Sequence, residues 1–171
     1  MNETELVSRA KSGDREAFAE LYGLYKDRLY RYAFYRLQSE TDAEDAVQDC
    51  VVSAYTQIGK LKKPQAFPSW IFRILYFTCN AQIKRQAQLR QNSNIDDFSD
   101  RLFDNSAETA VLKTELQNAL NHLSDDEKEI VLLSAVAGFN SKEIAKTVGI
   151  TAGSVRSKLS RSLKKMREFL E

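Results

Sequence analysis

The chain has 171 residues, 43% of them hydrophobic, and a net charge of only +1, which is typical of an ordinary globular protein. No apolar stretch is long enough to cross a bilayer and no N-terminal signal is apparent, so we expect a cytoplasmic protein without stable membrane insertion. Two cysteines in helical apolar patterns and a single histidine argue for buried thiols and against a metal site. Without a glycine-rich phosphate loop or a catalytic set, we expect no enzyme activity and no cofactor.

The small net charge conceals a strong segregation along the chain. Residues 1–49 hold seven bases and eleven acids, whereas residues 50–95 hold seven bases and no acid. Residues 96–113 hold two bases and five acids, and residues 114–171 hold nine bases and eight acids. Such alternation of acidic and basic blocks indicates several partner surfaces on one small protein.

Helical periodicity begins near the N-terminus. A short helix is predicted over 4–11 and is followed by a long one, with apolar residues at helical spacing, that ends near Leu37. Thr41 and Glu44 have the spacing of a capping box, so we expect them to open a third helix that stops at Gly59.

A fourth helix is predicted after a basic loop. Pro68 suits its first turn, and its apolar stripe reaches Ile83, so we expect the helix to end near Arg85. Because no alternating strand pattern appears, residues 1–90 are predicted to form an all-helical domain. Residues 91–106 are polar and acidic without a helical stripe, which indicates a flexible linker.

Helix signals resume at residue 107, and residues 107–171 are predicted to form a second helical domain. Ser124 and Glu127 form another capping box, and the helix they open ends before Gly138. The expected fold is therefore all-α, with two small helical domains joined by a flexible linker.

The last two helices have the pattern of a helix-turn-helix. Asn140 or Ser141 can cap a short helix that Gly149 ends, and Thr151 can cap the next. The final helix has an apolar stripe at spacings of four, four and three, formed by Val155, Leu159, Leu163 and Met166. Its remaining faces carry six Lys or Arg and no acid between residues 152 and 167, as a DNA-reading helix requires. The alternative is an ordinary solvated basic face.

Basic and aromatic residues alternate in the loop and helix from residue 60 to 85. Cations attract phosphates and exposed rings stack on unpaired bases, so this mixture is typical of a surface that binds single-stranded nucleic acid. Several of the rings must nevertheless belong to the core of so small a domain. The preferred contact residues are Lys62, Lys63, Gln65 and Phe67 in the loop and Arg73 and Tyr76 on the helix.

The third helix carries four acids in its first two turns. Acids at a helix N-terminus usually complement the helix dipole, which accounts for Asp42 and Glu44. Asp45 and Asp49 continue the acidic stripe beyond the capping region, and this leaves a protein-docking face as the second interpretation.

Taken in order, these segments resemble the extracytoplasmic-function (ECF) class of bacterial RNA polymerase sigma factors. The resemblance covers nearly the whole chain and is carried by GDREAFAELYGLY, DAEDAVQDCVVSAY, FPSWIFRIL, LSDDEKEIVLLSAVAGFNSKEIA and GITAGSVRSKLSRSLKKMR. It implies a promoter-specificity subunit that binds core RNA polymerase and performs no chemistry itself. It also implies an anti-sigma factor as a partner.

The resemblance assigns a role to each surface. Docking on core polymerase would fall to Asp42, Asp45, Gln48 and Asp49, and capture of the melted −10 element to the basic loop and the helix after it. The −35 element would be read as duplex by the final helix, with Ser154, Arg156, Ser157, Lys158, Ser160, Arg161 and Lys164 as contacts. The acidic linker would thread the polymerase cleft.

One departure from the family pattern weakens the −10 assignment, because Phe77 and Ala81 stand where relatives often have Asn and Asp. Two other functions remain open on the residues alone. The first is a free-standing transcriptional regulator that binds palindromic operators as a dimer, and the second is a sigma-like decoy that binds an anti-sigma protein.

Overall fold

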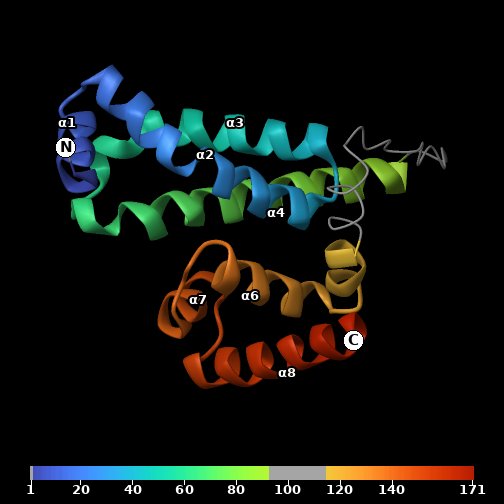
Figure 1. The fold of residues 1–171 in the computed structure, drawn as a ribbon. Helices are drawn as coiled ribbons and strands as arrows, with labels where there is room; N and C mark the ends of the chain where they lie inside the picture. The colour runs from blue at the N-terminus through green and yellow to red at the C-terminus, as the bar shows by residue number, and fades with distance from the viewer. Residues whose placement is uncertain (1, 93–114) are drawn as a thin grey trace.

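The computed structural model describes residues 2–92 and 115–171, and all regular structure in these ranges is helical (Figure 1). The predicted all-α fold is therefore confirmed. The helices are α1 (Glu3–Lys11), α2 (Arg15–Leu37), α3 (Glu40–Gln57), α4 (Phe67–Asn92), α6 (Asp125–Ala135), α7 (Ser141–Val148) and α8 (Ala152–Leu170), and residues 115–121 are also helical. Two 3₁₀ turns, η1 (Ile58–Lys60) and η2 (Pro64–Ala66), lie between α3 and α4. The expected linker falls mostly outside the described residues.

Helices α1 to α4 form one layer of the molecule, which we call the N-terminal layer (Figure 1). Helix α2 packs against α3 and α4, and these in turn pack against each other. Large side chains that are fully buried fill the space between them, including Tyr32, whose ring meets the edge of Phe72 at 6.2 Å between centroids. Burial of these apolar side chains stabilises the layer.

Helix α3 begins earlier than its sequence suggests. Its N-cap is Ser39, whose hydroxyl accepts the Asp42 N–H at 3.2 Å, so the capping box expected at Thr41 and Glu44 is wrong. Gln38 takes the left-handed conformation that ends α2, with φ of 59°, and the chain re-enters a helix within two residues. The sequence spacing favoured Thr41 with Glu44 as the start of this helix. In the structure the tight turn between α2 and α3 places the N-cap two residues earlier, at Ser39.

Helix α4 runs past its expected end near Arg85 to Asn92. Figure 1 shows its last turns extending beyond the ends of α2 and α3. With no neighbouring helix in the described residues to cover them, Ile83 is 37% exposed and Leu89 is 65% exposed. The apolar stripe predicted through Ile83 therefore stops contributing to the core one turn earlier, at Cys79.

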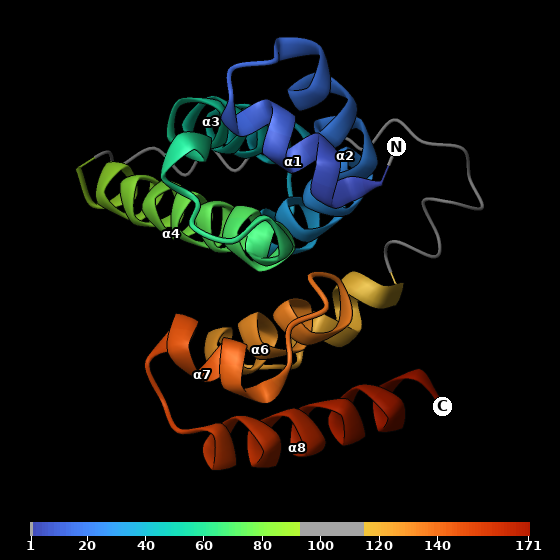
Figure 2. The same cartoon turned by 90° about the vertical axis from the view of Figure 1, so that its left-hand side faces the viewer.

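Residues 115–121 and helices α6 to α8 form a second layer, the C-terminal layer (Figures 1 and 2). Both predicted capping features at its helix starts are present: Ser124 pairs with Glu127, and Asn140, rather than Ser141, pairs with Glu143. Gly149 ends α7 at φ of 83°, and Thr151 caps α8, so the predicted helix-turn-helix is formed.

The buried stripe of α8 differs from its prediction at one position. Val155 and Met166 are buried and Leu159 is half-buried, but Leu163 is 41% exposed. Ser162 is fully buried instead, where its hydroxyl donates to Lys158 O at 2.6 Å and lies 3.3 Å from a Glu127 oxygen. A polar side chain holds the inward position because α6 offers it a carboxylate there.

The two layers face each other through α2 and α4 on one side and α6 on the other, with α8 on the far side of the C-terminal layer (Figures 1 and 2). No helix within residues 2–92 and 115–171 combines the length and apolar character needed to cross a membrane.

Candidate nucleic-acid and docking interfaces

The outer face of α8 is basic and exposed. Successive helix residues are rotated by about 100°, so Ser157, Ser160 and Lys164 point directly away from the stripe at Val155 and Met166. Arg156, Arg161 and Ser154 flank that line and are also exposed. Six of the seven predicted −35 contacts therefore share one solvent-facing surface.

The remaining member of that set is placed differently. Lys158 is half-buried at the edge of the stripe, and its carbonyl accepts the Ser162 hydroxyl. Lys165 is exposed, but its ammonium is engaged with Glu127 on α6 at 3.0 Å. A hydrogen bond from the Ser124 N–H and this ammonium lower the pKa of the Glu127 carboxyl to about 2.

The start of α8 is suited to an anion. Thr151 accepts the Ser154 N–H at 3.1 Å, and the first turn contains no acid to compete for the remaining N–H groups. A helix N-terminus with free N–H groups and a partial positive charge favours phosphate oxygens. The N-terminal part of a recognition helix is also the part that reaches base edges in the major groove.

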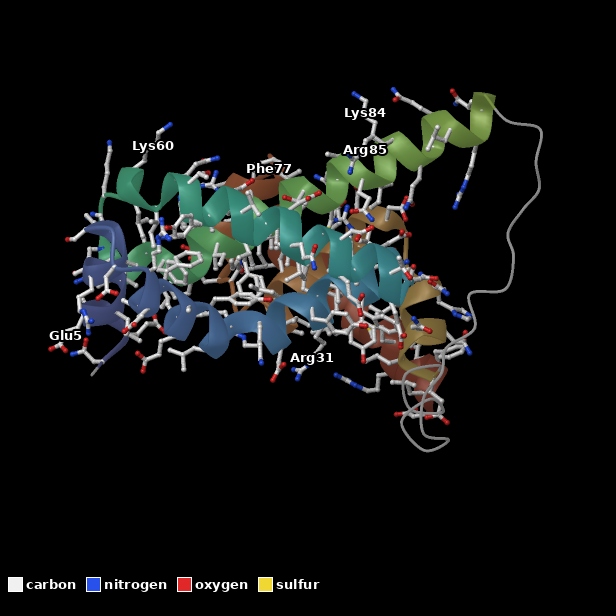
Figure 3. All side chains as sticks on the ribbon, turned by 90° about the horizontal axis from the view of Figure 1, so that it is seen from above. Glu5, Arg31, Lys60, Phe77, Lys84 and Arg85 are labelled. Atoms are coloured by element: carbon white, nitrogen blue, oxygen red, sulfur yellow. The ribbon has the colours of Figure 1, made fainter. Side chains whose placement is uncertain are left out.

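A second basic surface follows the loop before α4 and the outer face of α4 itself. Lys62, Lys63, Gln65 and Arg73 are all exposed, as predicted for nucleic-acid contacts. Figure 3 shows Lys60, Phe77, Lys84 and Arg85 along the same side of the N-terminal layer. All four of these side chains are exposed, and Phe77 is 53% exposed.

Two of the predicted aromatic and polar contacts do not lie on this surface. Phe67 is fully buried and meets the edge of the Tyr25 ring at 5.3 Å, so it cannot stack on a base in the folded layer. Tyr76 is 6% exposed, and its hydroxyl donates to Glu129 of the C-terminal layer at 3.3 Å. Phe77, which the predicted contact set omits, lies one helical turn after Arg73 and shares its exposed face.

The acidic residues of α3 line a groove beside the end of α4. The groove has a volume of about 430 Å³ and contains three of the four predicted docking residues, Asp45, Gln48 and Asp49. Its other wall is formed by Gln82, Arg85, Gln86 and Leu89. Asp42 lies at its edge, where one carboxylate oxygen accepts the Gln86 amide at 2.9 Å.

One buried polar atom in this groove has no partner among the described residues. Gln82 is 6% exposed, and its Nε2 donates to the carbonyl of Asp42 at 3.1 Å. Because that partner is an acceptor, the amide orientation is fixed and Oε1 is left unpaired. Buried oxygens are normally hydrogen-bonded, so Gln82 Oε1 is an exception in the wall of the groove, and the exposed polar groups of α3 in the groove are Asp45, Gln48 and Asp49.

Within the described parts of the chain, no three His, Cys, Asp or Glu side chains gather as a metal site. Cys50 and Cys79 are both free and buried, which confirms the prediction for these thiols. Burial raises the pKa of each to about 12.

Comparison with known proteins identifies two family regions in this chain. The family model described as Sigma-70 region 2 matches residues 21–88, and the one described as Sigma-70, region 4 matches residues 113–166. The ECF RNA polymerase sigma factor SigM of Mycobacterium tuberculosis is 27% identical over 99% of this chain and 85% of its own length. The ECF RNA polymerase sigma factor SigW of Bacillus subtilis is 24% identical over 96% of this chain and 94% of its own length.

Solved structures share the fold. The sigma factor RpoE of Bartonella quintana, in complex with the anti-sigma factor NepR, superposes with a TM-score of 0.78 at 24% identity, over 90% of this chain and 96% of that one. CnrH in complex with the cytosolic domain of CnrY gives a TM-score of 0.73 at 22% identity, over 98% and 96%.

Proposed function

Since the chain belongs to the sigma-70 family, as an ECF-class RNA polymerase sigma factor that directs promoter-specific transcription initiation, we propose how its surfaces divide that work. The N-terminal domain, residues 1–90, binds core polymerase and the −10 element. The C-terminal domain, residues 107–171, binds the −35 element, and residues 91–106 link the two. As a polymerase subunit the protein acts in the cytoplasm and carries no catalytic activity of its own.

The observation that carries this proposal is the separation of charge between surfaces. The outer face of α8 and the loop–α4 surface are basic, whereas the α3 wall of the groove presents exposed Asp45 and Asp49, and Arg85 lies where the α4 surface meets the groove. Phosphates bind to cations, and a protein partner with basic side chains binds to carboxylates. One chain can therefore hold DNA at two places and polymerase at a third.

For the −10 element we propose a revised contact set. Lys62, Lys63, Gln65 and Arg73 remain in it because they are exposed together. Phe77 replaces Phe67 as the ring that stacks on an unpaired base, since base stacking requires an exposed aromatic face. Tyr76 belongs to the set only when the C-terminal layer has moved away from it.

For the −35 element the contacts are the six exposed residues of α8, with Lys158 in a supporting position. Core polymerase docks on the α3 groove, where the exposed Asp45, Gln48 and Asp49 meet basic side chains of the polymerase. Asp42 shapes the groove through Gln86. We propose an anti-sigma factor as a further partner, because RpoE of Bartonella quintana was solved with one.

The decisive experiment is transcription in vitro with core polymerase on a genomic template, with and without this chain. We expect new start sites that share −35 and −10 sequences only when the chain is present. Absence of any stimulated start site would refute the proposal. Retardation of palindromic DNA by the chain without polymerase would instead indicate a free-standing regulator.

Variants of α8 then test the −35 assignment in the same assay. Arg156→Ala and Arg161→Ala should each weaken promoter recognition by about 1–3 kcal/mol if the side chain reads a base. Substitution of a residue that contacts phosphate should instead lower DNA affinity evenly across promoter sequences and reduce the salt dependence of binding. Lys165→Ala is the matched control, since this lysine is engaged with Glu127. Unchanged output in both arginine variants would remove α8 as the −35 reader.

A further inference from the structure

The first helix of the chain packs against the loop that is proposed to contact the −10 element. Helix α1 contacts α2 and both 3₁₀ turns, η1 and η2, which lie on either side of residues 61–63. Its buried face consists of Leu6, Val7 and Ala10. Figure 1 shows α1 at the end of the N-terminal layer where the chain passes from α3 into α4. The loop therefore rests on α1 as well as on the two helices that it connects.

The hydrogen bonds within this loop are local. Leu61 N–H donates to Ile58 O at 3.1 Å, and Ala66 N–H donates to Lys63 O at 2.9 Å, so each bond spans three residues. Leu61 is buried, whereas the three proposed contact residues of the loop are exposed. Bonds of such short range shape a turn, but the surfaces behind the loop decide where that turn lies.

Tyr25 of α2 links α1 to the residue that follows the loop. Its hydroxyl donates to Glu3 Oε1 at 2.6 Å, and its ring makes a T-shaped contact with the Phe67 ring at 5.3 Å between centroids. Phe67 is the first residue of α4 and is fully buried, and Tyr25 is 4% exposed. A buried hydroxyl needs a hydrogen-bond partner, and an edge-to-face ring pair has a preferred geometry. The orientation of the Tyr25 ring, and with it the start of α4, therefore depends on a carboxylate of α1.

Helix α1 is tied to α2 at both of its ends. Glu3 accepts the Tyr25 hydroxyl in the first turn, and Arg9 Nε donates to Asp14 Oδ2 at 2.9 Å near the last turn. Asp14 is itself the N-cap of α2. A helix of nine residues is too short to be stable in isolation, so these contacts and the buried face determine its position. Helix α1 is thus a fixed support for the loop.

We propose that Glu3 and Tyr25 are positioning residues for the −10 element, which act through Phe67 to hold Lys62 and Lys63 where they bind the unpaired strand. The match to Sigma-70 region 2 begins at residue 21, so α1 lies outside it. This inference rests on the proposed function. A loop that is correctly placed only part of the time lowers the apparent affinity by that fraction, while the cations themselves remain present.

The first test measures the order of the loop in the free chain by hydrogen exchange. Tyr25→Phe and Glu3→Leu each remove the hydrogen bond and retain the aromatic ring. The Ala66 amide should then exchange at least about threefold faster, because a hydrogen bond of this kind changes an equilibrium by about two- to tenfold. Glu3→Gln retains an acceptor oxygen and should exchange like the wild type. Glu5→Leu is the matched control, since it removes the same charge from an exposed position in the same turn.

The second test measures DNA binding by the complex with core polymerase. One probe is a fragment from a start site mapped by transcription in vitro, with its −10 region single-stranded, and the other is a duplex that carries only the −35 region. Tyr25→Phe and Glu3→Leu should weaken binding to the first probe by about threefold or more. Binding to the second probe and to core polymerase should not change, and neither should the Glu3→Gln and Glu5→Leu variants differ from wild type on either probe.

Salt dependence separates positioning from direct contact. Lys63→Ala removes a proposed phosphate contact and should reduce the slope of log affinity against log salt concentration by about one. Tyr25→Phe and Glu3→Leu leave every cation in place, so the slope for the single-stranded probe should stay at the wild-type value. A slope lowered in these two variants as much as in Lys63→Ala would overturn the positioning role.

Three further results would overturn the inference: unchanged amide exchange in both variants, faster exchange without weaker binding to the single-stranded probe, or equal weakening on both probes. Circular dichroism checks that the helices are retained. If Glu3→Leu loses helical structure, Tyr25→Phe decides, because it removes a single oxygen atom and keeps the ring. A wild-type chain that binds neither probe with core polymerase would refute the proposed function, whereas the exchange measurement does not depend on that function.

Discussion

At the scale of single residues, burial decides which side chains can react or bind. Cys50 lies in the N-terminal core, where its thiol donates to Ile71 O at 3.7 Å, and Cys79 lies nearby on α4. Burial raises both pKa values to about 12, so at pH 8 about one thiol in ten thousand is in the reactive thiolate form.

We therefore expect both native thiols to react with a disulfide reagent at pH 8 at least 100-fold more slowly than in the urea-unfolded chain. The measurement is the release of the coloured thiol from the reagent over time. An exposed cysteine introduced at Ser157 serves as the internal control and should react at the rate of a free thiol. Rapid reaction of Cys50 or Cys79 would mean that the N-terminal layer opens readily.

The same distinction between core and surface revises the set of residues proposed to contact the −10 element. The sequence predicts Phe67 as a nucleic-acid contact because basic and aromatic residues are interleaved along this loop and helix. In the structure its ring fills the core against Tyr25, whereas Phe77 is exposed beside Arg73. Periodicity assigns a face to each residue, but it does not say how much of that face a neighbouring helix covers.

At the scale of elements, the turn between α7 and α8 depends on one backbone conformation. Gly149 has φ of 83°, and a Cβ built there meets no atom within 4 Å. Any effect of a substitution therefore comes from the backbone. The left-handed conformation costs a residue other than glycine about 1–2 kcal/mol. Within a helix, in contrast, glycine is less favourable than alanine.

Gly149→Ala should lower the free energy of unfolding by about 1 kcal/mol. Gly153→Ala is the matched control, since it adds the same methyl group in the first turn of α8, where the nearest atom is 3.9 Å away, and it should stabilise by about 0.5–1 kcal/mol. Urea unfolding followed by circular dichroism measures both. Equal effects of the two substitutions would contradict this account of the turn.

Helices α6 and α8 are held together by the carboxylate of Glu127, which accepts the Ser124 N–H and pairs with Lys165. Its pKa in the folded chain is lowered to about 2 by these contacts. A lowered pKa means that the stabilisation is complete above the unfolded value of about 4.3 and is lost as the pH falls toward 2.

Glu127→Gln keeps an oxygen for the Ser124 N–H but removes the charge. We expect it to lower the free energy of unfolding by about 1 kcal/mol at pH 7, because hydrogen bonds to charged groups are the stronger ones. The difference from wild type should shrink between pH 4 and pH 2. Urea unfolding at several pH values tests this, and a difference that does not change with pH would rule out the ionised carboxylate as the cause.

At the scale of the whole molecule, oppositely charged surfaces occupy different places. The acidic α3 groove lies beside the end of α4, and the basic surface of α8 lies on the far side of the C-terminal layer. DNA and a basic protein partner can therefore bind without competing for the same side chains.

Asp45→Asn together with Asp49→Asn should weaken binding to core polymerase by about 2 kcal/mol through lost charged hydrogen bonds. Titration of fluorescent protein with core enzyme measures this. Glu16→Gln with Glu20→Gln makes the same change in net charge on exposed positions of α2 and should leave affinity unchanged. Equal weakening by both pairs would indicate a general effect of charge and no docking site in the groove.

The sequence alone determined the helices, most of their caps and the surfaces available for binding. Local signals suffice there: apolar spacing marks the buried stripes, Gly149 needs a left-handed turn, and blocks of one charge mark the surfaces. Ordered motifs along the chain were enough to indicate the family.

Only the tertiary structure decided which side chains those surfaces expose. The start of α3 at Ser39, the burial of Phe67 and Tyr76, and the exposure of Phe77 all depend on which helices lie against them. The pair of Arg36 with Glu129 joins positions 93 residues apart, and neither residue is marked by any local pattern. Contacts between distant segments arise from packing, which no periodicity within one helix can specify.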